Sequence, residues 1–334
     1  MICDEAFMSS ALDVPIKGDQ TYPVSTPAVE HQYDEDQNKW LRMVNLELCD
    51  RADLSSLMSN INFLQKLASV RLYCGATDYE PKEIDACLCL PTKIELIGTR
   101  IIFSYQLSPF GSVYDLLHQH SRPLDETSIA ILFSRAVYCL AQLHSRGVLH
   151  RNLSTKHLLV NEARKEDSSN ELAIQLCGLG SLTQFPLSCN ILRNDLPPIH
   201  VSWRGWKLWY DKSMGSVSHP TAWYSPEMIG QDFVGYSWPS DIHSLGWILY
   251  ELCTKNEPYV GLSPIQVVLE KLTNDKAPEI ADDLEAKGYS NELIRVFQAC
   301  VCRNPGKRPT ANQLLHTPWV QRGWRTPLKR SLFI

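Results

Sequence analysis

Residues 150–157 carry the side chains best suited to chemistry in this sequence: two imidazoles, a guanidinium, an amide, two hydroxyls and an ammonium. The segment contains no carboxylate. The amide of Asn152 can accept a hydrogen bond but cannot take up a proton at neutral pH. His157 offers a ring nitrogen, whereas Mg²⁺ prefers hard oxygen ligands. Asn152 is therefore a poor general base, and His157 is a poor magnesium ligand.

Apolar periodicity predicts a small strand-rich region followed by a larger helical one. The predicted strands are residues 40–49, two short strands within 96–105, and a hairpin of 158–160 with 172–176. The predicted helices are residues 52–70, 127–144, 241–253, 291–302 and 311–316. Residues 1–36 are polar and aperiodic, which is typical of a flexible arm.

The composition argues against several classes of function. The 334 residues carry a net charge of −5, which gives no electrostatic reason to expect a nucleic-acid partner. There is no long apolar run and no secretory signal pattern at the start, so we expect no membrane partner. The 11 cysteines lack the paired spacing of a metal site and favour reduced thiols. We therefore expect an intracellular protein, in the cytoplasm or the nucleus.

Five motifs, in the same order along the chain, resemble those of the protein-kinase family. Residues 150–157 have the form of the catalytic-loop signature H-R-D-L-x-x-x-N. The others are a hinge-like segment at 103–117, an A-P-E-like segment at 223–227, a D-x-W-S-x-G-like segment at 240–246 and an R-P-T ending at 303–310. The resemblance implies an α+β, two-lobed kinase-like fold, with a degenerate, small, β-rich N-lobe and a mainly helical C-lobe.

The same resemblance implies four segments along the chain. They are a flexible N-terminal arm at 1–36, a degenerate kinase N-lobe at 37–108, a kinase-like C-lobe at 109–322 and a C-terminal tail at 323–334.

Measured against the kinase pattern, the chain lacks each group that performs phosphoryl transfer. The replaced positions are the base (Asn152), the two metal ligands (His157 and Gly178), the strand lysine (Arg42) and the helix glutamate (Asn60, or Ile61 beside it). Only one glycine precedes Trp40, so no glycine-rich loop can cover nucleotide phosphates. The resemblance thus implies a protein that is not an enzyme and has no catalytic residue, cofactor or metal.

Other motif residues are retained, and they are those with structural roles in kinases. Glu227 and Arg308 match a buried ion pair, and Asp241 matches a carboxylate that binds backbone N–H groups of the catalytic loop. His150 and Arg151 match residues packed beneath that loop. The chain keeps the residues with structural roles and lacks those that perform phosphoryl transfer. This pattern favours a fold that is used to bind partners.

Within kinases, the chain most resembles the STRAD group, which are pseudokinase adaptors of the sterile-twenty branch. The matching segments are residues 45–49, 148–151, 156–159, 176–179, 223–228 and 267–272. The resemblance implies an adaptor and allosteric activator of a liver-kinase-B-type serine/threonine kinase involved in cell polarity and signalling. A helical-repeat, armadillo-like scaffold protein would complete the complex. The last residues, 329–334, lack the Trp-Glu-Phe ending of better-known members, which leaves scaffold binding through the tail open.

The activation-segment equivalent contains a candidate interface made of three tryptophans at three-residue spacing, Trp203, Trp206 and Trp209. The alternative, that these rings cover the local core, is equally open.

Two alternative functions stay open. One is an atypical, residually active serine/threonine kinase of the sterile-twenty type. The other is a fold that binds ATP without catalysis, which the missing glycine-rich loop disfavours.

Overall fold

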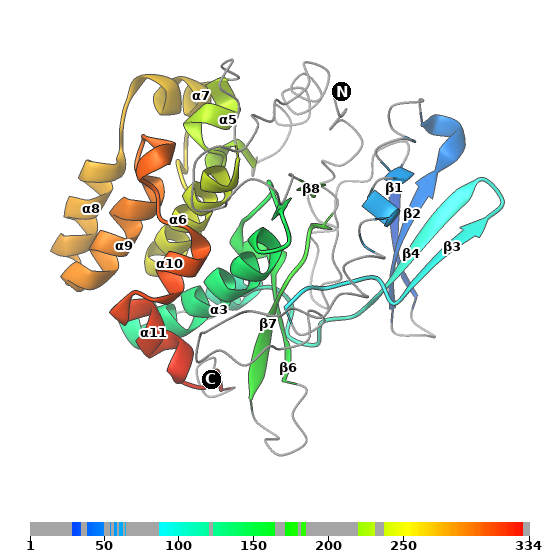
Figure 1. Ribbon diagram of the computed structural model, residues 1–334, viewed down its shortest axis with the longest axis horizontal. Helices are drawn as coiled ribbons and strands as arrows, with labels where there is room; N and C mark the ends of the chain where they lie inside the picture. Colours follow the sequence, from blue (N-terminus) through cyan, green and yellow to red (C-terminus); the bar gives the residue numbers. More distant parts are fainter. Residues whose placement is uncertain are drawn as a thin grey trace.

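The computed structural model describes residues 29–34, 39–49, 87–119, 123–163, 171–179, 182–184, 220–230 and 237–329, together with scattered positions between 54 and 64. These residues form two lobes (Figure 1). One is a small lobe built on an antiparallel sheet, and the other is larger and mostly helical. The predicted α+β, two-lobed architecture is therefore confirmed.

The sheet of the small lobe has the strand order β1-β2-β4-β3. Its strands are β1 (Val29–Asp34), β2 (Lys39–Asn45), β3 (Lys93–Ile97) and β4 (Arg100–Gln106). Alternation along β2 places Trp40, Arg42 and Val44 in the interior. Gly98, at φ +59°, permits the tight turn between β3 and β4 that the sequence predicted. The described positions between 54 and 64 are helical, also as predicted.

The prediction of a flexible arm over residues 1–36 is wrong at its end, because Val29–Asp34 form strand β1. All six residues pair with β2, from Val29 opposite Val44 to Asp34 opposite Lys39. An edge strand is held mainly by backbone hydrogen bonds to a single neighbour, and these do not depend on apolar side chains. The polar sequence VEHQYD therefore lacks the apolar alternation by which a strand is predicted. The small lobe therefore includes residues 29–34, whereas the sequence analysis placed its start at 37. Residues 1–28 lie outside the described residues.

The large lobe is built around α3 (Glu126–His144) and α6 (Trp238–Thr254). Asp125 begins α3 by accepting a hydrogen bond from the Ser128 N–H at 2.7 Å. The other helices are α2 (Val113–Gln119), α5 (Pro226–Gly230), α7 (Pro264–Thr273), α8 (Ala277–Ala286), α9 (Asn291–Val301), α10 (Ala311–Leu315) and α11 (Pro318–Arg325). Strands β6 (Leu158–Glu162) and β7 (Leu172–Leu176) form the predicted hairpin, and β5 (Val148–Leu149) pairs with β8 (Thr183–Gln184).

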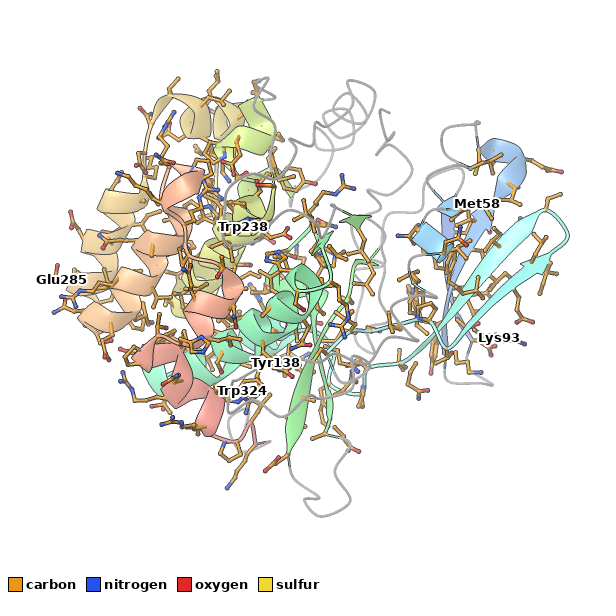
Figure 2. All side chains as sticks on the ribbon, viewed as in Figure 1. Met58, Lys93, Tyr138, Trp238, Glu285 and Trp324 are labelled. Carbon is orange, nitrogen blue, oxygen red and sulfur yellow. The ribbon has the colours of Figure 1, made fainter. Side chains whose placement is uncertain are left out.

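The predicted start of the C-terminal tail at residue 323 is also wrong, because α11 continues to Arg325 and packs on α3. A Cβ at Gly323 would lie 2.1 Å from the Ala130 carbonyl oxygen, so only glycine allows this approach. The Trp324 ring lies 4.4 Å from the Tyr138 ring, and both are labelled in Figure 2. Leu328 is buried, and its carbonyl accepts a hydrogen bond from the Leu172 N–H. Residues 323–329 are thus part of the large lobe, and their apolar contacts lie far away in sequence.

Candidate functional site

The catalytic-loop segment, residues 150–157, lies between β5 and the start of β6 and is held from below by α6. Asp241 on α6 accepts hydrogen bonds from the backbone N–H groups of His150 (2.8 Å) and Arg151 (2.7 Å). It also bonds His144 Nε2 at 3.0 Å. Burial would raise the pKa of Asp241, but His144, His150 and these hydrogen bonds outweigh it and lower the pKa. The contacts of Asp241 with the loop are those predicted from the sequence.

His150 and Arg151 both lie in the interior beneath the loop. His150 Nε2 lies 2.6 Å from the Cys177 carbonyl oxygen, and Nδ1 accepts from the Asn152 N–H at 3.2 Å. This arrangement requires a neutral ring with its proton on Nε2, and burial lowers the His150 pKa accordingly. Arg151 has a φ of +65°, a conformation that costs energy in a non-glycine residue. The bond from its N–H to Asp241 offsets that cost, so the loop keeps a strained shape.

Asn152 takes the place of the general base at the tip of this frame and is half-buried. A carboxylate there could accept a proton from an acceptor hydroxyl, whereas an amide cannot at neutral pH. Hydrogen bonds to Asp241 fix the backbone next to Asn152, so the shape of the loop is kept. The proton acceptor is absent because residue 152 carries an amide.

His157 and Gly178, the two metal-ligand positions, pack directly against each other. A Cβ built on Gly178 would lie only 2.6 Å from His157 Cδ2, and Gly178 has a φ of +73°. His157 Nδ1 is held by the Ser154 hydroxyl at 3.1 Å, and the His157 carbonyl accepts from the Cys177 N–H at 2.9 Å. The imidazole therefore occupies the space into which an aspartate side chain at 178 would extend. The His157 ring fits in this position because residue 178 has no side chain.

Arg42 and Asn60, at the positions of the lysine–glutamate pair, make different contacts from that pair. Arg42 is buried on β2, with its guanidinium 5.2 Å from the centre of the Phe103 ring. Asn60 Nδ2 donates to the Leu179 carbonyl at 3.0 Å. This bond ties the small-lobe helix to the segment at Gly178 through a neutral amide. The sequence identified Asn60 as a replaced position but did not predict this contact.

Glu227 and Arg308 form the ion pair expected from the retained motifs. Arg308 Nη1 and Nη2 donate to the two carboxylate oxygens at 2.6 and 3.1 Å, a two-pronged geometry that is strong for this pair of groups. Burial would raise the pKa of Glu227, but the charge of Arg308 outweighs it and lowers the pKa. Arg308 also donates to the Cys302 and Pro239 carbonyls. The pair thus joins α5, α6 and the segment after α9.

Glu251 on α6 is a buried carboxyl group that sequence reasoning missed. Thr155 Oγ1 donates to it at 3.0 Å and Trp223 Nε1 at 2.7 Å, so it joins the catalytic-loop segment to the end of the activation-segment equivalent. Burial raises its pKa to about 8, with a further rise from Glu257 and a partial offset from Lys156 and the two hydrogen bonds. The available signal was an acidic residue among the apolar positions of the helix predicted at 241–253.

The raised pKa of Glu251 makes stability depend on pH. In the folded state the Glu251 carboxyl keeps its proton up to about pH 8, whereas in the unfolded chain it releases the proton near pH 4.5. The contribution of Glu251 to the free energy of unfolding therefore falls as the pH rises between those two values. We expect the free energy of unfolding to fall by about 2 kcal/mol from pH 6 to 8 through this group. Glu251→Gln should flatten that slope, measured by urea unfolding, while the exposed Glu279→Gln should leave it unchanged. An unaltered slope in Glu251→Gln would contradict the assignment.

The remaining predicted site residues, Trp203, Trp206 and Trp209, lie outside the described residues, and their interface role stays a prediction. Within the described ranges, no group of three His, Cys, Asp or Glu side chains is arranged to hold a metal ion. Nor does any helix there combine the length and apolar character needed to cross a membrane.

Comparison with known proteins shows the family to which this chain is similar. The family model described as "Protein kinase domain" matches residues 96–320. The chain is 28% identical over 214 residues to "MAP kinase kinase kinase mkh1" of Schizosaccharomyces pombe, covering 63% of this chain and 16% of that protein. It is 27% identical over 227 residues to "Mitogen-activated protein kinase kinase kinase 1" of Arabidopsis thaliana, covering 67% and 31%. The chain thus spans less than a third of these two relatives' length.

A shorter relative is covered more fully. "Serine/threonine-protein kinase ppk11" of Schizosaccharomyces pombe is 27% identical over 282 residues, which is 84% of this chain and 73% of that protein. The family model alone matches well over half of this chain, and the order of its motifs agrees with the fold described above. The chain therefore belongs to the protein kinase domain family.

Proposed function

We propose that this chain is a pseudokinase of the STRAD type, which activates a partner kinase by binding it and transfers no phosphate itself. The observation that carries this proposal is the packing of His157 against Gly178. A lost metal site that had merely decayed would leave space, whereas here an imidazole fills the position of the missing aspartate. Meanwhile the Asp241 contacts and the Glu227–Arg308 pair keep the frame intact. Selection for shape without chemistry accounts for both features.

The proposed partner is a liver-kinase-B-type serine/threonine kinase, together with a helical-repeat scaffold protein. An adaptor that contacts the active conformer of its partner more favourably than the inactive one shifts the partner's population toward activity. Coupling of this kind is typically worth 1–3 kcal/mol, which corresponds to roughly a 5- to 150-fold change.

The test is co-purification of the full chain with the candidate kinase and scaffold, followed by assay of the partner's peptide phosphorylation. We expect a complex and a rise of about tenfold or more in the partner's activity. Asn152→Ala is the matched control: it removes the last polar group at the base position, and activation should be unchanged. An adaptor that leaves the partner's activity at its basal level would refute the proposal.

A residually active kinase is the second candidate, favoured by relatives whose names describe them as protein kinases. Transfer of radiolabelled phosphate from ATP by the isolated chain, lost in Asn152→Ala, would establish it. Thermal unfolding with and without ATP then distinguishes a fold that binds ATP from one that does not, since a bound ligand raises the unfolding temperature.

A further inference from the structure

The outer side of α7 and the turn before it carry most of the large apolar side chains that the described residues expose. Of nine such side chains, five lie between positions 260 and 272: Val260, Leu262, Ile265, Leu269 and Leu272. Their exposed fractions run from 37% to 69%. Helix α7 lies beside α5 at the edge of the large lobe, far from the small lobe (Figure 1). Nothing in the proposed function accounts for this surface, which we call the α7 face.

The inner side of α7 fixes the helix on the large lobe. Val267 is fully buried, and Val268 packs against α5. Lys271 is buried as well, and its Nζ donates to the carbonyls of Ala222 at 2.6 Å and Tyr224 at 2.5 Å. These contacts prevent the helix from turning to bury its outer apolar side chains. The α7 face is therefore displayed on a rigid support, which lowers the entropy cost of binding.

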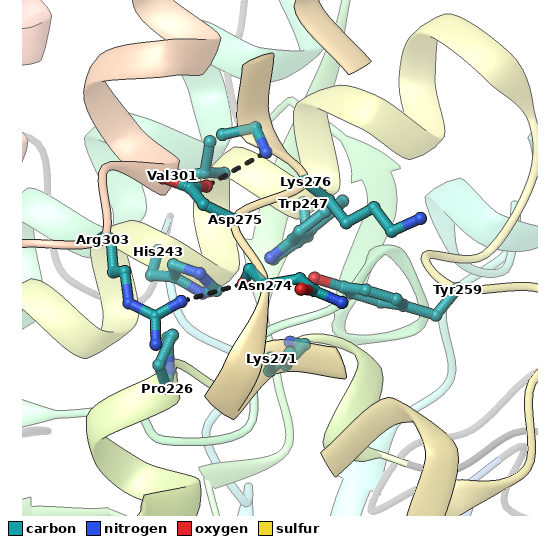
Figure 3. A pocket seen from close by; sticks show the side chains of 11 residues that line it. Pro226, His243, Trp247, Tyr259, Lys271, Asn274, Asp275, Lys276, Val301 and Arg303 are labelled. Atoms are coloured by element: carbon teal, nitrogen blue, oxygen red, sulfur yellow. Dashed lines mark hydrogen bonds between the residues drawn. The ribbon is translucent and has the colours of Figure 1, made fainter. Parts of the chain in front are cut away.

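The turn before α7 holds Val260 out in the solvent. Tyr259 and Gly261 have positive φ angles of +58° and +86°, and the Leu262 N–H donates to the Tyr259 carbonyl at 3.1 Å. The Tyr259 ring lies beside Trp247 (Figure 3), with 4.9 Å between the ring centres. A positive φ costs energy in a tyrosine, and this ring contact offsets the cost. The anchored turn leaves Val260 at its tip, where 69% of its surface is exposed.

The α7 face carries no exposed charge. Residues 260–274 are all described, and each exposed residue among them is apolar, a glycine or a neutral polar residue. Of the two charged residues in this range, Lys271 is buried, and Glu270 is half-buried and pairs with Lys276 at 3.2 Å. Depletion of charge around apolar side chains is typical of the centre of a protein–protein interface. It also allows two copies of the face to meet without electrostatic repulsion.

The size of the α7 face matches what two copies of the chain need to associate. Its five apolar residues together expose roughly 400 Å², which is comparable to the largest apolar patch of a typical monomer. Two such faces would remove about 800 Å² of apolar surface from water. A standard interface buries about 1,200–2,000 Å², a little more than half of it apolar. Two copies therefore supply the apolar share of an interface near the smaller end of that range.

We propose that the α7 face binds the same face of a second copy of this chain, forming a symmetric dimer. Ile265, Leu269 and Leu272 are four and three residues apart, so they form one stripe along the helix. When two such stripes meet across a two-fold axis, the middle residue of each lies near its own counterpart. That residue is Leu269, which is also the most exposed of the three.

The test is the oligomeric state of the full chain, measured by sedimentation velocity at protein concentrations from about 1 to 200 µM. We expect the mass to rise with concentration toward twice the 38.0 kDa of one chain. Leu269→Lys places two like charges near each other and should weaken association at least about a hundredfold. Leu96→Lys is the matched control: it adds the same charge at another exposed leucine, in the small lobe, and should leave association unchanged.

A mixture of two variants tests whether the contact is symmetric. Leu269→Glu alone should also be monomeric. An equal mixture of Leu269→Glu and Leu269→Lys should associate more tightly than either alone, because opposite charges then meet across the axis. The proposal is wrong if the wild-type chain stays monomeric at the highest concentration, if Leu269→Lys associates like wild type, or if the mixture stays monomeric. A monomeric wild type whose co-purification with the candidate kinase is lost in Leu269→Lys would also overturn it and would assign the face to that kinase.

Discussion

Replacing Arg308 with alanine is expected to lower the free energy of unfolding by about 3–5 kcal/mol, the usual cost of removing one partner of a buried ion pair. The Glu227 carboxylate would remain in the interior without the paired guanidinium, although the Ser240 hydroxyl would still donate to it at 2.8 Å. The Cys302 and Pro239 carbonyls would lose their donor as well. Urea unfolding at pH 7, followed by circular dichroism, measures the loss.

The dependence on pH separates this ion pair from simple loss of packing. The folded-state pKa of Glu227 is lowered, so its contribution is present above the unfolded value of about 4.5 and disappears as pH falls through the folded value. The difference between wild type and Arg308→Ala should therefore shrink in acid. Arg308→Lys is the matched control: it keeps the charge, loses the two-pronged geometry and should show an intermediate loss. A loss below about 1 kcal/mol in Arg308→Ala would show that the pair contributes little.

The sequence predicted this ion pair because its two residues belong to motifs that are recognisable by type and order, although they are 81 positions apart. The same holds for Asp241 and the catalytic-loop segment. Long helices such as α3 and α6 were predictable because their apolar positions recur over several turns. Both kinds of feature are visible in the chain without knowledge of its contacts.

The features that sequence reasoning missed depend on neighbours that are distant in the chain. Strand β1 is held by its pairing with β2, and residues 323–329 by contacts with α3 and β7. Glu251 could be seen as an acidic residue on an apolar helix, but its partners Thr155 and Trp223 could not. Buried Lys271, which binds two backbone carbonyls, is a similar case. In each of these cases the periodicity of the local sequence does not predict the feature, because the contact that determines it joins residues that are distant in the chain.

Restoring the metal-binding aspartate alone, as Gly178→Asp, is expected to destabilise the protein by about 3 kcal/mol. Two effects combine: overpacking against the His157 ring, at about 1–3 kcal/mol, and a side chain at positive φ, at about 1–2 kcal/mol. His157 cannot move aside freely, because Ser154 holds its Nδ1 and its own carbonyl binds the Cys177 N–H. Thermal and urea unfolding of the full chain would measure the loss.

The double variant His157→Asn/Gly178→Asp reinstates the kinase pair and removes the clash, so it should recover part of that loss. A double-mutant cycle on these two positions should give a favourable coupling of about 1–2 kcal/mol, since the residues are in contact. Additive effects would mean that the imidazole does not determine what fits at 178. Even with Asn152→Asp added, we expect no phosphate transfer, because Arg42 and Asn60 still occupy the lysine and glutamate positions and Asn60 bonds the Leu179 carbonyl. Measurable transfer by that triple variant would show that Arg42 and Asn60 do not prevent phosphate transfer.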